Sequence, residues 1–122
     1  MSAHQMVCHL SDAFRAFVGR KPFRPAHTVF HRTVVKWMAL YLPIPWVHGI
    51  RTSPEIDQEK GGTRPAAFAA DVAELEAFVE LVTAATRTFD WQVHPVFGPL
   101  TEGEWLRWGY LHMDHHLRQF GA

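Results

Sequence analysis

The stretch that decides the predicted fold is Thr-Glu-Gly-Glu-Trp-Leu-Arg-Trp-Gly-Tyr-Leu-His-Met-Asp-His-His-Leu-Arg-Gln-Phe, residues 101–120. Thr101 and Glu104 have the spacing of a capping box, in which each side chain accepts a hydrogen bond from the other residue's backbone N–H. Two neighbouring stripes follow at helical spacing. One stripe is apolar and comprises Leu106, Tyr110, Met113, Leu117 and Phe120. The other comprises Trp105, Gly109, His112, His116 and Gln119. Imidazoles beside an apolar stripe predict a helix that lines a pocket inside a helical bundle.

His112 and His116 are the strongest candidate metal ligands in the chain. They lie four residues apart, so a helix places them on one face, one turn apart. Neutral imidazole is a common nitrogen ligand for divalent metals, and two of them at this spacing can grip one ion. The alternative is a pair of surface or hydrogen-bonded histidines, and the spacing alone leaves it open.

A third histidine occupies a matching place on a helix near the N-terminus. Ser2 and Gln5 form a second capping box, and Gly19 followed by Lys21-Pro22 ends the helix. The apolar stripe of this helix comprises Met6, Leu10, Ala13, Phe14 and Phe17. His9 flanks that stripe as His112 and His116 flank theirs. Three imidazoles would then converge on one ion and leave a fourth position open, as catalytic metal sites do.

Two further helices are expected between these ends. One runs from about Thr28 to Leu42, where Pro43 and Pro45 stop it. Its apolar side comprises Phe30, Val34, Trp37, Met38 and Tyr41. The other begins near Pro65, with a bundle-type seam of Phe68, Val72, Leu75, Val79 and Val82. Residues 43–64 form a long irregular segment of the kind that often covers a site, and Trp46 is expected to pack it down. The chain is predicted to be one all-α domain over residues 1–122, a four-helix bundle.

Composition excludes several classes of protein. The 122 residues contain 12 basic and 12 acidic side chains, so the basic excess typical of nucleic-acid binders is absent. The basic residues do gather between residues 15 and 36, which keeps nucleic-acid binding as a weaker third hypothesis. No apolar run is long enough to span a membrane, and no secretory signal is visible. Cys8 is the single cysteine, which fits a reducing compartment. We expect a cytoplasmic protein without membrane or nucleic-acid partners.

The order of these motifs resembles the DinB/YfiT-like superfamily of metal-dependent proteins. The resemblance rests on Met6-Val7-Cys8-His9-Leu10-Ser11-Asp12 in the early helix and on the late helix with His112-x-x-x-His116-x-x-Gln119. The stretches Pro43-Ile44-Pro45-Trp46, Gly61-Gly62-Thr63 and His94-Pro95-Val96-Phe97-Gly98-Pro99 add the likeness to one uncharacterised bacterial branch. The resemblance implies a four-helix bundle with a divalent metal held by His9, His112 and His116. Some members of the superfamily are thiol-dependent transferases or isomerases, so the resemblance implies that this chain could have an activity of that kind.

The chain departs from the superfamily pattern at its start. Members usually have a helix before the one that bears the first histidine, and here only Met1-Ser2 precede that helix. Either the start is trimmed or the bundle lacks its usual first helix. An apolar groove left by a missing helix would favour a homodimer.

Other polar residues receive plainer interpretations. His115 points about 100° away from His116 on a helical wheel and is expected at the surface, although a shifted register would let it substitute as a ligand. His94 is expected to be structural, and His4, His27, His31 and His48 to be ordinary. Asp12 and Asp114 are expected to be solvent-exposed rather than partners of imidazole N–H groups. Gln119 would either orient a metal-bound water or pack between helices.

Two functions are compatible with these motifs. The first is a metal-dependent enzyme acting on a small molecule, using Zn²⁺, Ni²⁺ or Fe²⁺, as a hydrolase or a thiol-dependent transferase. The metalloprotease motif His-Glu-x-x-His is absent because position 113 is Met, and Cys8 lacks the adjacent base that a cysteine nucleophile needs. No catalytic residue can be assigned. The second function is a non-catalytic helical bundle that serves as a binding or oligomerisation module.

Overall fold

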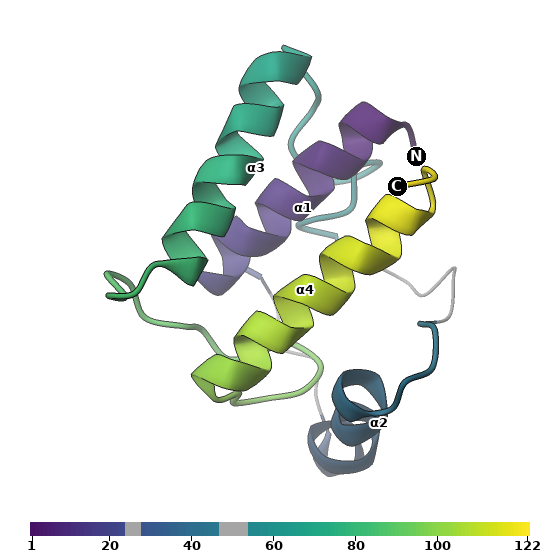
Figure 1. Cartoon of the computed structure of the whole chain (residues 1–122), viewed down its shortest axis with the longest axis vertical. Coiled ribbons are helices and arrows are strands. Elements are labelled where there is room, and N and C mark those ends of the chain that lie inside the picture. The colour runs from purple at the N-terminus through teal and green to yellow at the C-terminus, as the bar shows by residue number, and fades with distance from the viewer. Residues whose placement is uncertain (24–27, 47–53) are drawn as a thin grey trace. The chain divides into compact units, whose positions relative to one another are not determined.

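The computed structural model describes residues 1–23, 28–46 and 54–122. Within them lie four α-helices, one short π-helix and no strand beyond an isolated bridge between His94 and Gly98. This confirms the all-α, four-helix prediction. The chain divides into two compact units (Figure 1), here called unit 1, Met1–Phe23 with Thr52–Trp91, and unit 2, Arg24–Arg51 with Gln92–Ala122.

Unit 1 is built on a pair of helices, α1 (Ala3–Phe17) and α3 (Phe68–Thr83), which pack side by side (Figure 1). The predicted capping box between Ser2 and Gln5 is present, and Gly19 adopts φ 85° just after the helix, a backbone conformation that favours glycine. All five residues of the predicted α1 stripe are buried. Phe14 of α1 stacks on Phe78 of α3 with ring centroids 6.2 Å apart.

The predicted seam of α3 is only partly correct. Leu75 and Val82 are buried as expected, but Phe68 is 54% exposed. Phe78, which lies outside the seam, is buried instead. The helix begins at Phe68 rather than near Pro65, so Phe68 lies in its first turn, where its ring meets His4 of α1 edge to face and about half of the side chain stays exposed.

Unit 2 contains the π-helix η1 (His31–Val35), then α2 (Lys36–Tyr41), and the long helix α4 (Glu102–Arg118), with α2 in contact with α4. The capping box from Thr101 to Glu104 opens α4 as predicted. The helix before Pro43 is also found, but its first half is π-helical. The prediction that its apolar side is buried was wrong: Phe30, Val34, Trp37, Met38 and Tyr41 are all exposed, and Leu40 is buried. Of η1 and α2, Leu40 is the buried residue, so this helical segment packs through a different side from the apolar one.

The apolar stripe of α4 is not the most buried side of this helix. Leu106, Tyr110 and Phe120 of the apolar stripe are exposed, with Tyr110 at 68%. Trp105, Trp108 and Gly109 are the buried residues of this helix. Two indole rings and a glycine, rather than aliphatic side chains, therefore form the buried face of α4, and its histidines are partly buried. None of the helices within the described ranges is long and apolar enough to cross a membrane.

Candidate metal centre

His112 and His116 of α4 face one another across one helical turn. Their Nε2 atoms are 3.1 Å apart, and their ring centroids are 4.8 Å apart. Zinc–nitrogen bonds of about 2.0–2.1 Å at tetrahedral angles place two ligand nitrogens roughly 3.3 Å apart. The pair is therefore already close to the spacing that a shared metal ion requires. One Nε2 atom donates a hydrogen bond to the other, and a metal ion would replace that proton.

Gln119, one turn beyond His116, fixes the orientation of the neighbouring rings. Its side-chain oxygen lies 3.3 Å from His116 Nδ1, and its amide nitrogen lies 3.3 Å from His115 Nε2. Because an amide oxygen only accepts, His116 carries its proton on Nδ1 and its lone pair on Nε2. Hydrogen bonds of this kind orient metal-bound histidines in many proteins. The structure thus gives Gln119 a partner that the sequence did not suggest.

Trp46 lies against the same histidines, as expected for a residue that packs its segment down. Its indole N–H donates to the carbonyl oxygen of Ala39 at 2.9 Å. Its ring lies 6.3 Å from His112 and 5.9 Å from His115, measured between centroids. Residues 47–53 of the predicted loop lie outside the described residues.

A cavity of about 410 Å³ in unit 2 opens beside this cluster. It is bounded by Leu42, Pro43, Ile44, Pro45, Trp46, Arg107, Leu111, Asp114, His115, Arg118 and Gln119. Its walls combine a proline-rich apolar side with the polar face of α4. His115, expected at the surface, is partly buried and lines this cavity.

His9 of α1 is 3% exposed and is held by its own hydrogen bond. Its Nδ1 lies 2.9 Å from the carbonyl oxygen of Ile56, which can only accept, so Nδ1 carries the proton and Nε2 the lone pair. Burial lowers the pKa of His9, and the Ile56 bond and nearby carboxylates only partly oppose this effect. The ring is therefore neutral at pH 7, which is the form that binds metals.

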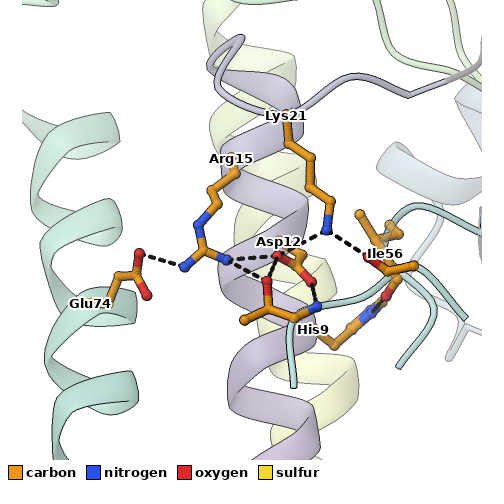
Figure 2. Close-up of polar contacts among 8 residues, drawn as sticks. His9, Asp12, Arg15, Lys21, Ile56 and Glu74 are labelled. Carbon is orange, nitrogen blue, oxygen red and sulfur yellow. Dashed lines mark hydrogen bonds and ion pairs between the residues drawn. The ribbon is translucent and has the colours of Figure 1, made fainter. Parts of the chain in front are cut away.

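The segment that carries Ile56 is fixed to α1 through Asp12 (Figure 2). Asp12 is fully buried and accepts hydrogen bonds from the backbone N–H of Thr63 at 2.6 Å and from its hydroxyl at 2.7 Å. Arg15 and Lys21 pair with the same carboxylate at 2.6 and 3.3 Å. Arg15 also pairs with Glu74 of α3, and Lys21 donates to the Gly61 carbonyl.

This network corrects the expectation that Asp12 is solvent-exposed. Burial alone would raise the pKa of Asp12, but the hydrogen bonds from Thr63 and the charge and hydrogen bond of Lys21 outweigh it, so the pKa is lowered. Asp12 is an anion that holds residues 54–63 against α1. Asp114, by contrast, pairs with Arg118 at a more exposed position, nearer the expectation for it.

Of the three predicted ligands, His9 lies on α1 in unit 1, and His112 and His116 lie together on α4 in unit 2. His94, expected to be structural, is buried, and its Nδ1 accepts hydrogen bonds from the backbone N–H groups of Val96 and Phe97. His31 is paired locally with Thr28. His27 and His48 lie outside the described residues.

Comparison with known proteins places the chain in a family. A family model described as "Protein of unknown function (DUF1569)" matches residues 2–122. The chain belongs to the DUF1569 family. No curated protein and no solved structure matches this DUF1569 chain.

Two features around His9 could not be predicted from the sequence: the Ile56 carbonyl and the buried carboxylate of Asp12. The Ile56 carbonyl is a backbone group, and no residue type signals it. The buried position of Asp12 could be inferred only from the cluster of basic residues around it, a pattern that by itself favours a solvated surface.

Cys8 is buried, and burial together with Asp71 raises its pKa to about 11, so its thiol is not an activated nucleophile, as the sequence indicated.

The Asp12 network predicts a large stability effect. Asp12→Ala leaves Thr63 and the two cations without their common partner, and breaking a buried pair of this kind costs about 3–5 kcal/mol. We expect a loss near the lower end of that range in the free energy of unfolding in urea, because Arg15 and Lys21 are partly exposed. Asp114→Ala, which removes a surface pair, is the matched control and is expected to cost less than ~1 kcal/mol.

The difference in the free energy of unfolding between wild type and Asp12→Ala should also depend on pH. Because the folded pKa of Asp12 is lowered, its contribution is complete above the unfolded value of about 3.9 and is lost as the pH falls through the folded value. The stability gap between wild type and Asp12→Ala should therefore narrow below about pH 4. If Asp12→Ala and Asp114→Ala lower the free energy of unfolding by the same amount at neutral pH, Asp12 does not anchor the segment.

Proposed function

We propose that this DUF1569 protein is a metal-dependent enzyme related to the DinB/YfiT-like superfamily, with His9, His112 and His116 as ligands of one divalent ion. The observation that carries the proposal is the 3.1 Å approach of the two Nε2 atoms on α4. The tautomers support it, because His9 and His116 each carry Nδ1–H against an oxygen and present Nε2 as the coordinating atom.

Three imidazole nitrogens suit Zn²⁺, Ni²⁺ or Fe²⁺, because imidazole is intermediate between hard oxygen and soft sulfur ligands and binds all three ions. Such an ion lowers the pKa of a water or thiol bound in its open position and so supplies a nucleophile near neutral pH. The chain's own residues hold the ring nitrogens in place, through the Ile56 carbonyl on one ligand and Gln119 on another.

The cavity beside α4 supports a small-molecule substrate. It carries both charges and apolar surface, with Arg107, Arg118 and Asp114 on one wall and Ile44 and Trp46 on the other. Pockets of a few hundred Å³ with few polar groups are typical of small-molecule sites. Hydrolysis or thiol-dependent transfer is the proposed reaction class, in the cytoplasm.

Metal analysis tests the proposal. Purified wild-type protein, prepared without chelator, should retain an ion that resists dialysis, and His112→Ala should lose it, because two imidazoles bind far more weakly than three. His115→Ala is the matched control: it changes the adjacent histidine of the same helix, which is not a proposed ligand. Circular dichroism checks that both variants fold. Retention of the ion by a His9, His112 and His116 triple variant would contradict the ligand assignment.

A homodimer is the second element of the proposal, and the exposed face of η1 and α2 supports it. This face, here called the α2 face, comprises Val29, Phe30, Val34, Trp37, Met38 and Tyr41. Its three aromatic rings are 47–60% exposed, so covering them would bury about half of the ~150–250 Å² that such side chains offer. With the other residues, the face supplies a large part of the ~800 Å² that each partner contributes to a standard interface. Lys36 adds no unpaired charge, because it pairs with Glu104 at 3.0 Å. Such a face is also what a non-catalytic oligomerisation module would need.

Light scattering coupled to size-exclusion chromatography tests the dimer. Wild type should elute with twice the chain mass, and Trp37→Glu should shift it to the monomer by placing a charge in the apolar contact. Val93→Glu, which changes another exposed apolar residue of unit 2, should leave the mass unchanged. A monomeric wild type would contradict the dimer without affecting the metal proposal.

A further inference from the structure

A second group of metal-ligating side chains lies in unit 1, at the start of the α1–α3 pair. It consists of His4 and Cys8 of α1 and Asp71 of α3. One ligand atom of each lies within 4.8 Å of the others. His4 and Cys8 are four residues apart, so they share one face of α1, and Asp71 meets them from the first turn of α3.

The contacts within this group are direct. His4 Nε2 lies 2.6 Å from Asp71 Oδ2, and the sulfur of Cys8 lies within 4.8 Å of ligand atoms of both residues. The backbone N–H of Ala66 donates to the same Oδ2 atom at 3.1 Å, which fixes the carboxylate from its own side. A divalent ion could replace the proton between His4 and Asp71 and contact the same three side chains.

We propose that His4, Cys8 and Asp71 form a separate metal site, with one nitrogen, one sulfur and one oxygen ligand for Zn²⁺. Imidazole, thiolate and carboxylate are the ligands that zinc uses, and three of them leave a fourth position for water.

The charge balance favours a divalent ion at this site. A thiolate and a carboxylate together carry two negative charges, so the loaded site is neutral, and the buried sulfur of Cys8 is not left as an isolated ion. Coordination deprotonates a thiol outright, and the proton passes to solvent.

The geometry allows an ion to enter. The side chains of His4 and Asp71 are 25% and 17% exposed, so this edge of the group meets solvent, whereas Cys8 forms its buried floor. Ligand atoms around zinc are roughly 3.3 Å apart, so the His4 ring must withdraw from Asp71 by less than ~1 Å. The ring also meets Phe68 edge to face, with centroids 5.2 Å apart, a contact that a shift of this size preserves.

Cobalt substitution distinguishes this site from the three-histidine site, because only this one contains sulfur. Full-length protein is stripped of metal and titrated with Co²⁺. We expect two equivalents to bind and a thiolate-to-cobalt charge-transfer band to appear in the near ultraviolet. Cys8→Ser, which is nearly isosteric, should abolish the band and lower the stoichiometry to one equivalent. His4→Ala should weaken Co²⁺ binding in the same band at least tenfold.

The two metal proposals fail separately in this titration. His112→Ala should keep the charge-transfer band and lose only the other equivalent. If wild type at saturating Co²⁺ shows no thiolate band, the group is a hydrogen-bonded link between α1 and α3 and the inference is overturned, whatever the three histidines bind. A Co²⁺ affinity in His4→Ala equal to that of wild type, measured from the same band, would overturn the ligand set.

Discussion

The buried negative charge of Asp12 is the constraint on which the geometry of unit 1 depends. A carboxylate with no exposed surface must be matched by donors, and the chain supplies them from Thr63, Arg15 and Lys21. Satisfying this one group brings an irregular segment onto the middle of α1 and links α1 to α3 through Glu74. The segment then delivers the Ile56 carbonyl to His9. The orientation of a candidate metal ligand therefore follows from an ion pair one helical turn away.

A hydrogen bond orients the ring of His9 and another orients the ring of His116, but the two bonding partners come from different parts of the chain. His9 is oriented by a backbone carbonyl from an irregular segment, whereas His116 is oriented by a side-chain amide from its own helix. Both arrangements protonate Nδ1 and leave the lone pair on Nε2. Fixing the tautomer before an ion arrives lowers the cost of assembling the site.

The parts of the structure that the sequence predicted are those governed by local chemistry. Both capping boxes, the end of α1 at Gly19 and the α1 stripe depend on residues within one or two turns, and all were confirmed. The faces of α2 and α4 were wrong for reasons that lie beyond local spacing. The first packs through Leu40 and leaves its apolar residues exposed, and the buried face of the second is built from Trp105 and Trp108 rather than from aliphatic residues. The three histidines were chosen as candidate ligands from spacing and resemblance, and that assignment stays a prediction. Ile56 acts through its backbone and Asp12 through a residue 51 positions away in sequence, so the sequence did not indicate either contact.

We propose that the imidazoles of residues 9, 112 and 116 coordinate one ion through Nε2. The most direct test is anomalous diffraction at the zinc edge from crystals of the Cys8→Ser variant, which lacks the competing sulfur ligand. We expect one strong anomalous peak, about 2.0–2.1 Å from the Nε2 atoms of all three rings. A peak bound by the α4 pair without His9, or no peak in zinc-loaded crystals, would contradict the claim.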